Sequence, residues 1–336
     1  MGSTGTRKPA GSGFCSRRRA GFTSGRPRPG GPHNGGAPKS GSGLEMQRLA
    51  MVEPIVRLAP VFILAPPLGL GAHLAACLDR HSAFAALPAT QLFCADTPRE
   101  LKRRWGDRMA SYDHGLIRAI AGLTLGGEDD GTALAASDWL ADRRDLKAGA
   151  IMADLASAVA PRQLVDASFL YPVDEGALER IGNDCPDARF IHLLRHPALV
   201  LPDPQRAAAR GANLWLRPHL AVHTFLAERD PLSWVRLRVE WLARDPATQL
   251  AGLLQWLGAA AGPIDVAALT DPARRFGFAR PGPALAPFGV DPGLLADPAL
   301  TTLFDAPLAP DLDETAWAEA GFDEETRAFA RLFGYS

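Results

Sequence analysis

Five consecutive apolar residues, 61–65, are followed at once by Pro66, Pro67 and a short turn that contains two glycines. An apolar run of this length indicates a parallel β-strand buried on both faces. The prolines end the strand, and residues 73–80 have the apolar spacing of a helix. A strand that turns into a helix N-terminus directs backbone N–H groups toward one point, as anion-binding loops do. Residues 68–72 contain no cation and no hydroxyl, so a turn that binds nothing is an equal alternative.

The alternation of short strands and helices continues along the chain. It predicts further strands at residues 84–88, 163–166, 189–194 and 234–239, and helices at 98–110, 113–125, 134–146, 149–160, 174–183, 211–228, 246–257 and 324–333. This order favours an α/β fold with a parallel central sheet flanked by helices. Ligands of such sheets bind outside the carboxyl ends of the strands, so the loops 66–72 and 195–203 form the candidate site.

The N-terminal segment differs in composition from the rest of the chain. Residues 1–43 contain eight Lys or Arg and no acidic residue, so the remainder carries a net charge of −9 within a chain of −1. A segment rich in Gly, Pro and Arg buries too little apolar surface to order itself. We predict a disordered leader at residues 1–50 and one domain at 51–336. A targeting peptide, or translated sequence upstream of a start at Met46 or Met51, are the alternatives for residues 1–45.

Composition excludes several other classes of protein. The acidic charge of residues 44–336 argues against nucleic acid as the main partner, and no apolar run approaches the roughly 20 residues that span a membrane. The four cysteines are scattered and the eight histidines form no paired pattern, so we expect no metal site. Scattered thiols without disulfide spacing are typical of a reducing compartment, and we expect a cytoplasmic protein.

Five stretches occur in an order typical of one enzyme family: FILAPPLGLGAHLAACLDRH, LVDASFLYPVDEGALERI, CPDARFIHLLRHP, VRLRVEWLARDPATQL with LLQWLG, and PFGVDPGLLADPAL. From about residue 61 to the C-terminus the chain resembles the bacterial sulfotransferases that use 3′-phosphoadenosine-5′-phosphosulfate (PAPS). The resemblance implies a P-loop NTPase-like fold. It also implies in-line transfer of a sulfuryl group from PAPS to a hydroxyl or amine, assisted by cations, backbone N–H groups and a base.

The nucleotide-binding positions of the family correspond to two loops of this chain. The family's Pro-Arg-Ser-Gly-Thr-Thr loop matches residues 67–72, and the Arg and Ser that bind the 3′-phosphate match Arg195 and Asp203. We expect Asp203 to pair with Arg195. The resemblance therefore places the nucleotide, PAPS or its product 3′-phosphoadenosine-5′-phosphate (PAP), at Leu68, Gly69, Leu70, Gly71, Ala72, Arg195 and Asp203.

Many of the family's polar positions are replaced in this chain. Leu68 stands at the Arg position of the loop, Ala89 at the position of a Glu that can act as base, and Val239 at that of the Tyr beside the adenine, whereas Glu240 is retained. Each lost charge-assisted hydrogen bond costs roughly 1.5–3 kcal/mol, and several would exceed the about 8 kcal/mol of micromolar binding. We therefore expect the fold to persist without the usual catalysis. His73 and His114 are candidate catalytic side chains, and His192 is expected to be a hydrogen-bonded core residue.

Three functions stay open, and with them the question whether the protein is an enzyme. In the first, the protein is an active sulfotransferase with an altered site, which uses PAPS and a small-molecule or carrier-bound acceptor. Alternatively, it is a catalytically inactive pseudo-sulfotransferase that binds a protein partner or acts as a scaffold. In the third, it is an α/β enzyme of another transfer class, in which the apolar residues 68–72 accommodate an acyl or lipid-like group in place of an anion.

Overall fold

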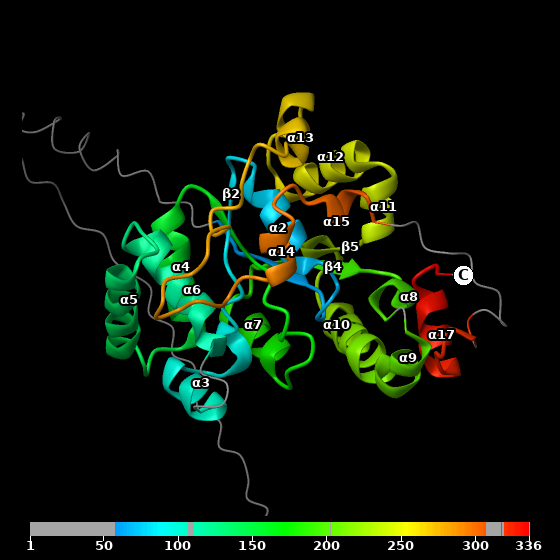
Figure 1. Ribbon diagram of the computed structural model, residues 1–336, viewed down its shortest axis with the longest axis horizontal. Coiled ribbons are helices and arrows are strands. Elements are labelled where there is room, and N and C mark those ends of the chain that lie inside the picture. Colours follow the sequence, from blue (N-terminus) through cyan, green and yellow to red (C-terminus); the bar gives the residue numbers. More distant parts are fainter. Residues whose placement is uncertain (1–57, 107–110, 202, 307–316, 318, 336) are drawn as a thin grey trace, which may run out of the picture. The chain divides into compact units, whose positions relative to one another are not determined.

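Five parallel strands form the centre of the protein (Figure 1). The computed structural model describes residues 58–106, 111–201, 203–306, 317 and 319–335, all within one structural unit, Pro54–Ser336. The predicted leader at residues 1–50 lies outside the described residues. The sheet has the strand order β2-β3-β1-β4-β5. Its strands are β1 (Val61–Leu64), β2 (Phe84–Ala86), β3 (Gln163–Asp166), β4 (Arg189–Leu194) and β5 (Trp234–Arg238).

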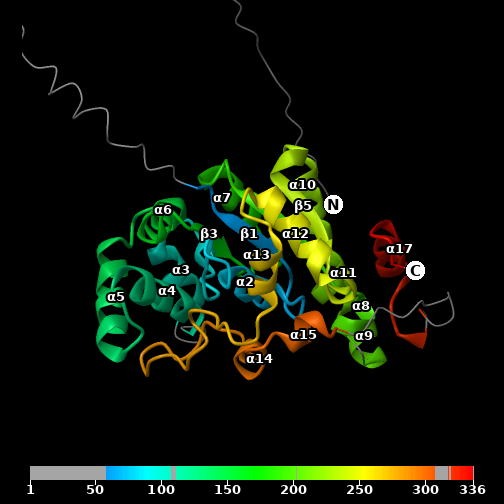
Figure 2. The same ribbon diagram turned by 90° about the horizontal axis from the view of Figure 1, so that it is seen from above.

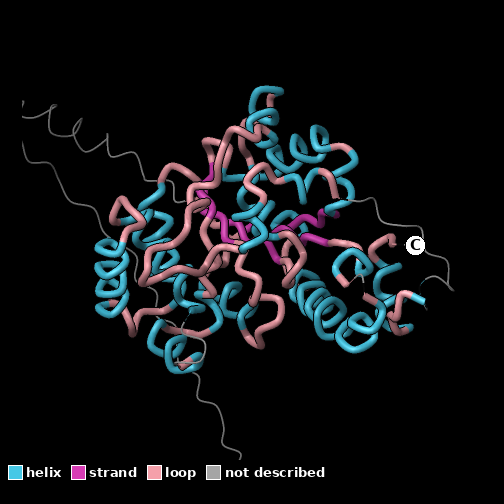
Figure 3. The backbone as a smooth tube through the Cα atoms, viewed as in Figure 1, coloured by secondary structure: helices cyan, strands magenta, loops and turns pink. Residues whose placement is uncertain are grey.

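The central strand β1 is fully buried, as its apolar run predicts. It pairs with β3 on one side and with β4 on the other, so that Phe62 lies opposite Asp166 and Phe190. Figure 3 shows the strands surrounded by helical segments. The predicted α/β fold with a parallel central sheet is therefore confirmed, and the strands at 163–166 and 189–194 coincide with β3 and β4.

Helices cover both faces of the sheet. They are α2 (Gly71–Asp79), α3 (Pro98–Trp105), α4 (His114–Thr124), α5 (Asp130–Asp142), α6 (Ala148–Val159), α7 (Ala177–Asp184), α8 (Pro197–Val200), α9 (Pro204–Gly211), α10 (Arg217–Ala227), α11 (Val239–Arg244), α12 (Pro246–Leu257), α13 (Pro263–Thr270), α14 (Pro292–Ala296), α15 (Thr301–Phe304) and α17 (Glu324–Leu332). None of these described helices is long and apolar enough to cross a membrane.

Alternate residues of β1 contribute to two separate cores, because successive side chains of a strand point to opposite faces. Val61 and Ile63 pack with residues of α2, α12 and α13. Phe62 and Leu64 pack with residues of α4, α6, α7 and α10. Figure 1 shows α12 and α13 on one side of the strands and α7 and α10 on the other, and Figure 2 shows α5 and α17 at opposite ends of the sheet.

Two sequence expectations about helices are corrected. The helix predicted over 98–110 ends at Trp105, where Gly106 adopts a left-handed φ of 51°. The helix predicted over 211–228 is divided: a π-helical turn, Ala212–Leu216, precedes α10, whose second residue is Pro218. Proline supplies no N–H for a helical hydrogen bond, so the regular pattern restarts there. Helix α11, which begins directly after β5, is absent from the prediction.

A chain of imidazole rings lies beneath the C-terminal helix α17. His192 Nε2 lies 2.9 Å from His219 Nδ1, while Arg236 donates to His192 Nδ1 at 3.3 Å and lies 3.2 Å from His223 Nδ1. A guanidinium group can only donate, so His192 Nδ1 accepts and the ring carries its proton on Nε2. His192 Nε2–H then donates a hydrogen bond to His219 Nδ1. Burial lowers the pKa of His192 well below 6.5 and that of His219 to about 3. His192 is therefore a hydrogen-bonded core residue, as expected.

Candidate functional site

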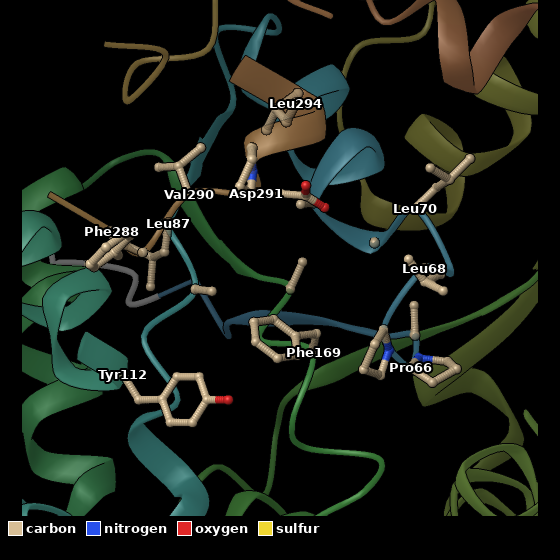
Figure 4. A pocket seen from close by; sticks show the side chains of 18 of the residues that line it. Pro66, Leu68, Leu70, Leu87, Tyr112, Phe169, Phe288, Val290, Asp291 and Leu294 are labelled. Atoms are coloured by element: carbon tan, nitrogen blue, oxygen red, sulfur yellow. The ribbon is translucent and has the colours of Figure 1, made fainter. Parts of the chain in front are cut away.

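A cavity of about 370 Å³ opens at the carboxyl edge of the sheet (Figure 4). Its walls come from the loops after β1, β2 and β3, from the segment before α4 and from the segment that leads into α14. The described lining residues are Ala65, Pro66, Pro67, Leu68, Leu70, Gly71, Ala72, Leu87, Ala89, Ser111, Tyr112, Ala167, Phe169, Phe288, Gly289, Val290, Asp291, Pro292 and Leu294. The loop 66–72 therefore lies at a cavity, at the edge where parallel sheets bind ligands.

The turn after β1 is held in an unusual backbone conformation. Leu68 and Leu70 have φ values of 68° and 62°, in the left-handed region where a side chain costs roughly 1–2 kcal/mol. The Gly69 N–H donates to the Pro66 carbonyl at 3.0 Å, and a Cβ on Gly69 would lie 2.9 Å from the same oxygen. Glycine is thus required at 69 by close packing, while Leu68 and Leu70 adopt the left-handed conformations that form the turn. Leu70 is the N-cap of α2 and provides no side-chain cap.

Arg195 joins the loop after β4 to this turn. Its Nη1 donates to the Leu68 carbonyl at 3.0 Å, and its own carbonyl accepts the Trp215 Nε1–H at 2.8 Å. Burial lowers the pKa of the Arg195 guanidinium, and the negative charge of Glu240 opposes this shift. The Arg195 Nε is buried and has no hydrogen-bond partner among the described residues.

The expected pairing of Asp203 with Arg195 stays a prediction. Asp203 Oδ1 accepts the Gln205 N–H at 2.9 Å. An Asp at the start of a helix satisfies backbone N–H groups that have no partner within the helix. Asp203 therefore has a local structural role at the start of α9, whereas Arg195 and the turn at 68–72 are brought together as the resemblance implies.

His73 lies in the first turn of α2, but it faces α14 and is not among the residues that line the cavity. Its side chain is only 3% exposed, and neither ring nitrogen has a hydrogen-bond partner among the described residues. Burial lowers its pKa; Asp291 and Asp297 act in the opposite direction, and Arg195 adds to the lowering. The imidazole is therefore neutral at physiological pH and lies behind the cavity wall.

His114 is also one layer removed from the cavity. Its ring stacks on Phe288, with centroids 5.6 Å apart and an interplanar angle of 7°, and Phe288 forms the wall. Burial lowers the pKa of His114, and Asp113 opposes the shift. Neither candidate histidine reaches the cavity directly.

A buried carboxylate that the sequence interpretation missed holds the loops after β2 and β3. Asp166 accepts hydrogen bonds from the hydroxyls of Thr90 at 2.9 Å, Tyr171 at 2.9 Å and Ser168 at 2.6 Å. Burial raises the pKa of Asp166, and these hydrogen bonds counteract the rise. An acidic residue that ends a buried strand and is followed two positions later by Ser was the available signal. The cluster supports the cavity wall at Ala167 and Phe169.

Charged groups are sparse at the cavity. Asp291 is the one charged side chain among its described lining residues, and its Oδ1 accepts the Gly293 N–H at 2.8 Å. The same described residues contain no cluster of three His, Cys, Asp or Glu that could hold a metal ion. The wall therefore presents mainly apolar side chains, the hydroxyl residues Ser111 and Tyr112, and one carboxylate, a poor fit to a phosphosulfate group, which is itself anionic.

Comparison with known proteins identifies the fold. No protein-family model and no curated protein matches the chain. Among solved structures, the chain is similar to the sulfotransferase domain from the curacin biosynthetic pathway, with 21% identity, a TM-score of 0.66, and coverage of 83% of this chain and 98% of that domain. It is also similar to the sulfotransferase domain from the Synechococcus PCC 7002 olefin synthase, with 22% identity, a TM-score of 0.63, and coverage of 82% and 94%. The fold that the five sequence stretches indicate is confirmed: this chain has the sulfotransferase fold.

Proposed function

We propose that this protein binds a small organic molecule at the carboxyl edge of its sheet and does not transfer sulfuryl groups from PAPS. The observation that carries the proposal is the composition of the cavity wall. The turn that the family uses for the phosphosulfate here contributes Leu68, Leu70 and Ala72, and the opposite segment contributes Asp291. A carboxylate beside a bound anion opposes binding, since like charges disfavour each other in a shared site.

The chemistry of transfer also lacks its usual groups among the described residues. A donor or cation aimed at the developing charge is commonly worth about 3–4 kcal/mol in rate, and the turn offers only backbone N–H groups. Ala89 stands where many relatives have a base, and both candidate histidines lie behind the wall. A binding role is therefore better supported than catalysis. We also propose a cytoplasmic location, because Cys77, Cys94 and Cys185 are buried free thiols, typical of reducing compartments.

Calorimetric titration of the full chain with PAP tests the proposal. The backbone N–H groups at the start of α2 can still attract an anion, so we expect weak binding, with a Kd above about 100 μM and a free energy weaker than about −5.5 kcal/mol. Submicromolar binding of PAP, or turnover of PAPS with any hydroxyl acceptor, would overturn the proposal.

Restoring a cation sharpens the same test. Leu68→Arg should strengthen PAP binding, and adding Asp203→Ser should strengthen it further than either change alone, because both groups act on one ligand. Leu232→Arg is the matched control, since Leu232 is 81% exposed and does not line the cavity. Equal effects of Leu68→Arg and Leu232→Arg would show that only overall charge matters.

A further inference from the structure

We infer that the cavity takes a hydrocarbon chain with a cationic amine at one end, the chain lying against the turn after β1 and the amine beside Asp291. The inference rests on the proposed function, because it names the ligand of the same site. It follows from the volume of the cavity, the kind of side chains in its wall, and the position of its one described charge.

The volume suits a ligand of moderate size. The cavity of about 370 Å³ lies in the range of about 300–1,000 Å³ usual for small-molecule sites. It is more than twice the roughly 150 Å³ apolar cavity that accommodates benzene. A chain of roughly ten carbons therefore fits.

The wall selects an apolar group. Leu70, Leu87, Val290 and Leu294 are buried residues of the wall, and Figure 4 shows Phe169 among the side chains around the cavity. Burying a polar group without a hydrogen-bond partner costs several kcal/mol, so a sugar or a phosphate gains little from these surfaces. A hydrocarbon chain has no such penalty, and its burial is favoured by the hydrophobic effect.

Two large apolar side chains of the wall are exposed to solvent. Leu68 and Phe288 are each 59% exposed and both line the cavity. Leu68 is also held at a left-handed φ of 68°, so an unfavourable backbone conformation keeps an apolar side chain at the opening. A bound chain would cover both side chains and remove apolar area from water.

The charge of Asp291 distinguishes ligands that have the same chain. Its Oδ1 accepts the Gly293 N–H at 2.8 Å, which fixes the carboxylate on the wall formed by residues 288–294 (Figure 4). His73 lies next to Gly293, but neither of its ring nitrogens has a hydrogen-bond partner among the described residues, so it does not pair with this carboxylate. An ammonium group beside this carboxylate is favoured, a hydroxyl is neutral and a carboxylate is repelled.

Calorimetric titration of the full chain with decylamine, decan-1-ol and decanoate tests the inference, at concentrations below micelle formation. We expect decylamine to bind at micromolar concentration, decan-1-ol about two- to fivefold more weakly, as for an exposed charge pair, and decanoate most weakly. Asp291→Asn should remove the preference for the amine over the alcohol. Its amide oxygen can still accept the Gly293 N–H, so α14 keeps its cap.

Two substitutions of exposed leucines localise the chain. Leu68→Asn should weaken decylamine binding at least threefold without loss of stability, because Asn tolerates the left-handed region. Leu232→Asn, at a side chain that is 81% exposed outside the cavity, should leave binding unchanged. Tightest binding of decanoate, equal effects of the two substitutions, or no binding of decylamine would each overturn the inference. Submicromolar binding of PAP overturns the proposed function, whereas weak binding of both PAP and decylamine overturns only this inference.

Discussion

The loops after β1 and after β4 lie at the same edge of the sheet, yet they differ in what their side chains contact. The turn at 68–72 contains no polar side chain and presents leucines to a cavity. The loop after β4 contains polar residues, and its backbone is bonded to Glu240 of α11. Glu240 accepts the His196 N–H at 2.7 Å and the Tyr335 hydroxyl at 3.2 Å. Two loops at one edge of a sheet can thus differ in role, one lining a cavity and the other holding internal structure.

The polar loop also anchors the C-terminal segment. The His196 ring stacks on Trp317, with centroids 5.0 Å apart, and Trp317 belongs to a buried cluster that includes Phe322 and Phe333. Buried polar groups are costly to leave without partners. The loop after β4 is therefore tied to the stability of the fold, whereas the turn after β1 is tied to its cavity. We expect substitutions to separate the two.

Acid should produce the largest loss of stability, and it should act through the buried histidines of β4 and α10. His192 and His219 are neutral in the folded protein, with pKa values below the 6.5 of the unfolded chain. Their stabilising contribution is complete above pH 6.5 and is lost as the pH falls toward their folded pKa values. Because the folded pKa of His219 is about 3, this ring should cost about 2 kcal/mol of stability at pH 5, and His192 acts in the same direction.

Urea denaturation at pH 7 and pH 5 measures this loss. His219→Gln, which cannot titrate, should reduce the difference in stability between the two pH values. Equal stability of the wild-type chain at pH 7 and pH 5 would contradict the neutral, buried state of these rings.

Replacing Glu240 should have the next largest effect. Glu240→Ala leaves the His196 N–H and the Tyr335 hydroxyl without their acceptor, in a site where Glu240 is only 4% exposed. We expect a loss of about 2–4 kcal/mol in the free energy of unfolding, measured by urea denaturation. Glu228→Ala, at an exposed acid, should change stability by less than about 0.5 kcal/mol. A similar small change for both variants would show that Glu240 does not stabilise the loop after β4.

The turn after β1 should respond weakly and in the opposite direction. Leu68→Gly relieves the left-handed conformation at φ 68° and removes an exposed side chain. The relief of roughly 1–2 kcal/mol is partly offset by the greater freedom of Gly in the unfolded chain, so we expect a gain of about 0.5 kcal/mol. Leu68→Ala keeps the strain and should give no gain. A stable Leu68→Ala and a destabilised Leu68→Gly would show that the turn is not strained.

Removal of the predicted leader should have the smallest effect on stability. A chain that begins at Met51 should unfold at the same temperature as the full chain, because residues 1–43 lack a core composition. A shift of several degrees in thermal denaturation would show that the domain boundary is elsewhere.

Most of the fold could be predicted because its signals are local. The apolar run at 61–65 and the alternation of strands with helices report burial on two faces directly. Helix α11 was missed because Val239 continues the apolar pattern of β5. The π-helical turn before α10 was missed because Pro218 interrupts the hydrogen bonds without interrupting the periodicity.

The candidate site was predicted less completely, because its contacts are not local. The sequence indicated an apolar turn at 68–72, but the opposite wall comes from residues 288–294. The partner of Arg195 is a backbone carbonyl 127 positions away, which no side-chain pattern reveals. The hydroxyls that surround Asp166 likewise come from two loops. Spatial convergence of this kind depends on tertiary packing rather than on residue type.

The left-handed leucines of the turn after β1 bear on how a ligand would enter. A free peptide with the sequence of this turn would rarely adopt φ values of 68° and 62° at Leu68 and Leu70. The surrounding structure, including the hydrogen bond from Arg195, imposes that shape before any ligand arrives. Binding then loses little conformational entropy in the turn, and affinity reflects the contacts themselves. The opening of the cavity is a preorganised receptor surface, and its shape is inherited from the fold rather than induced by its occupant.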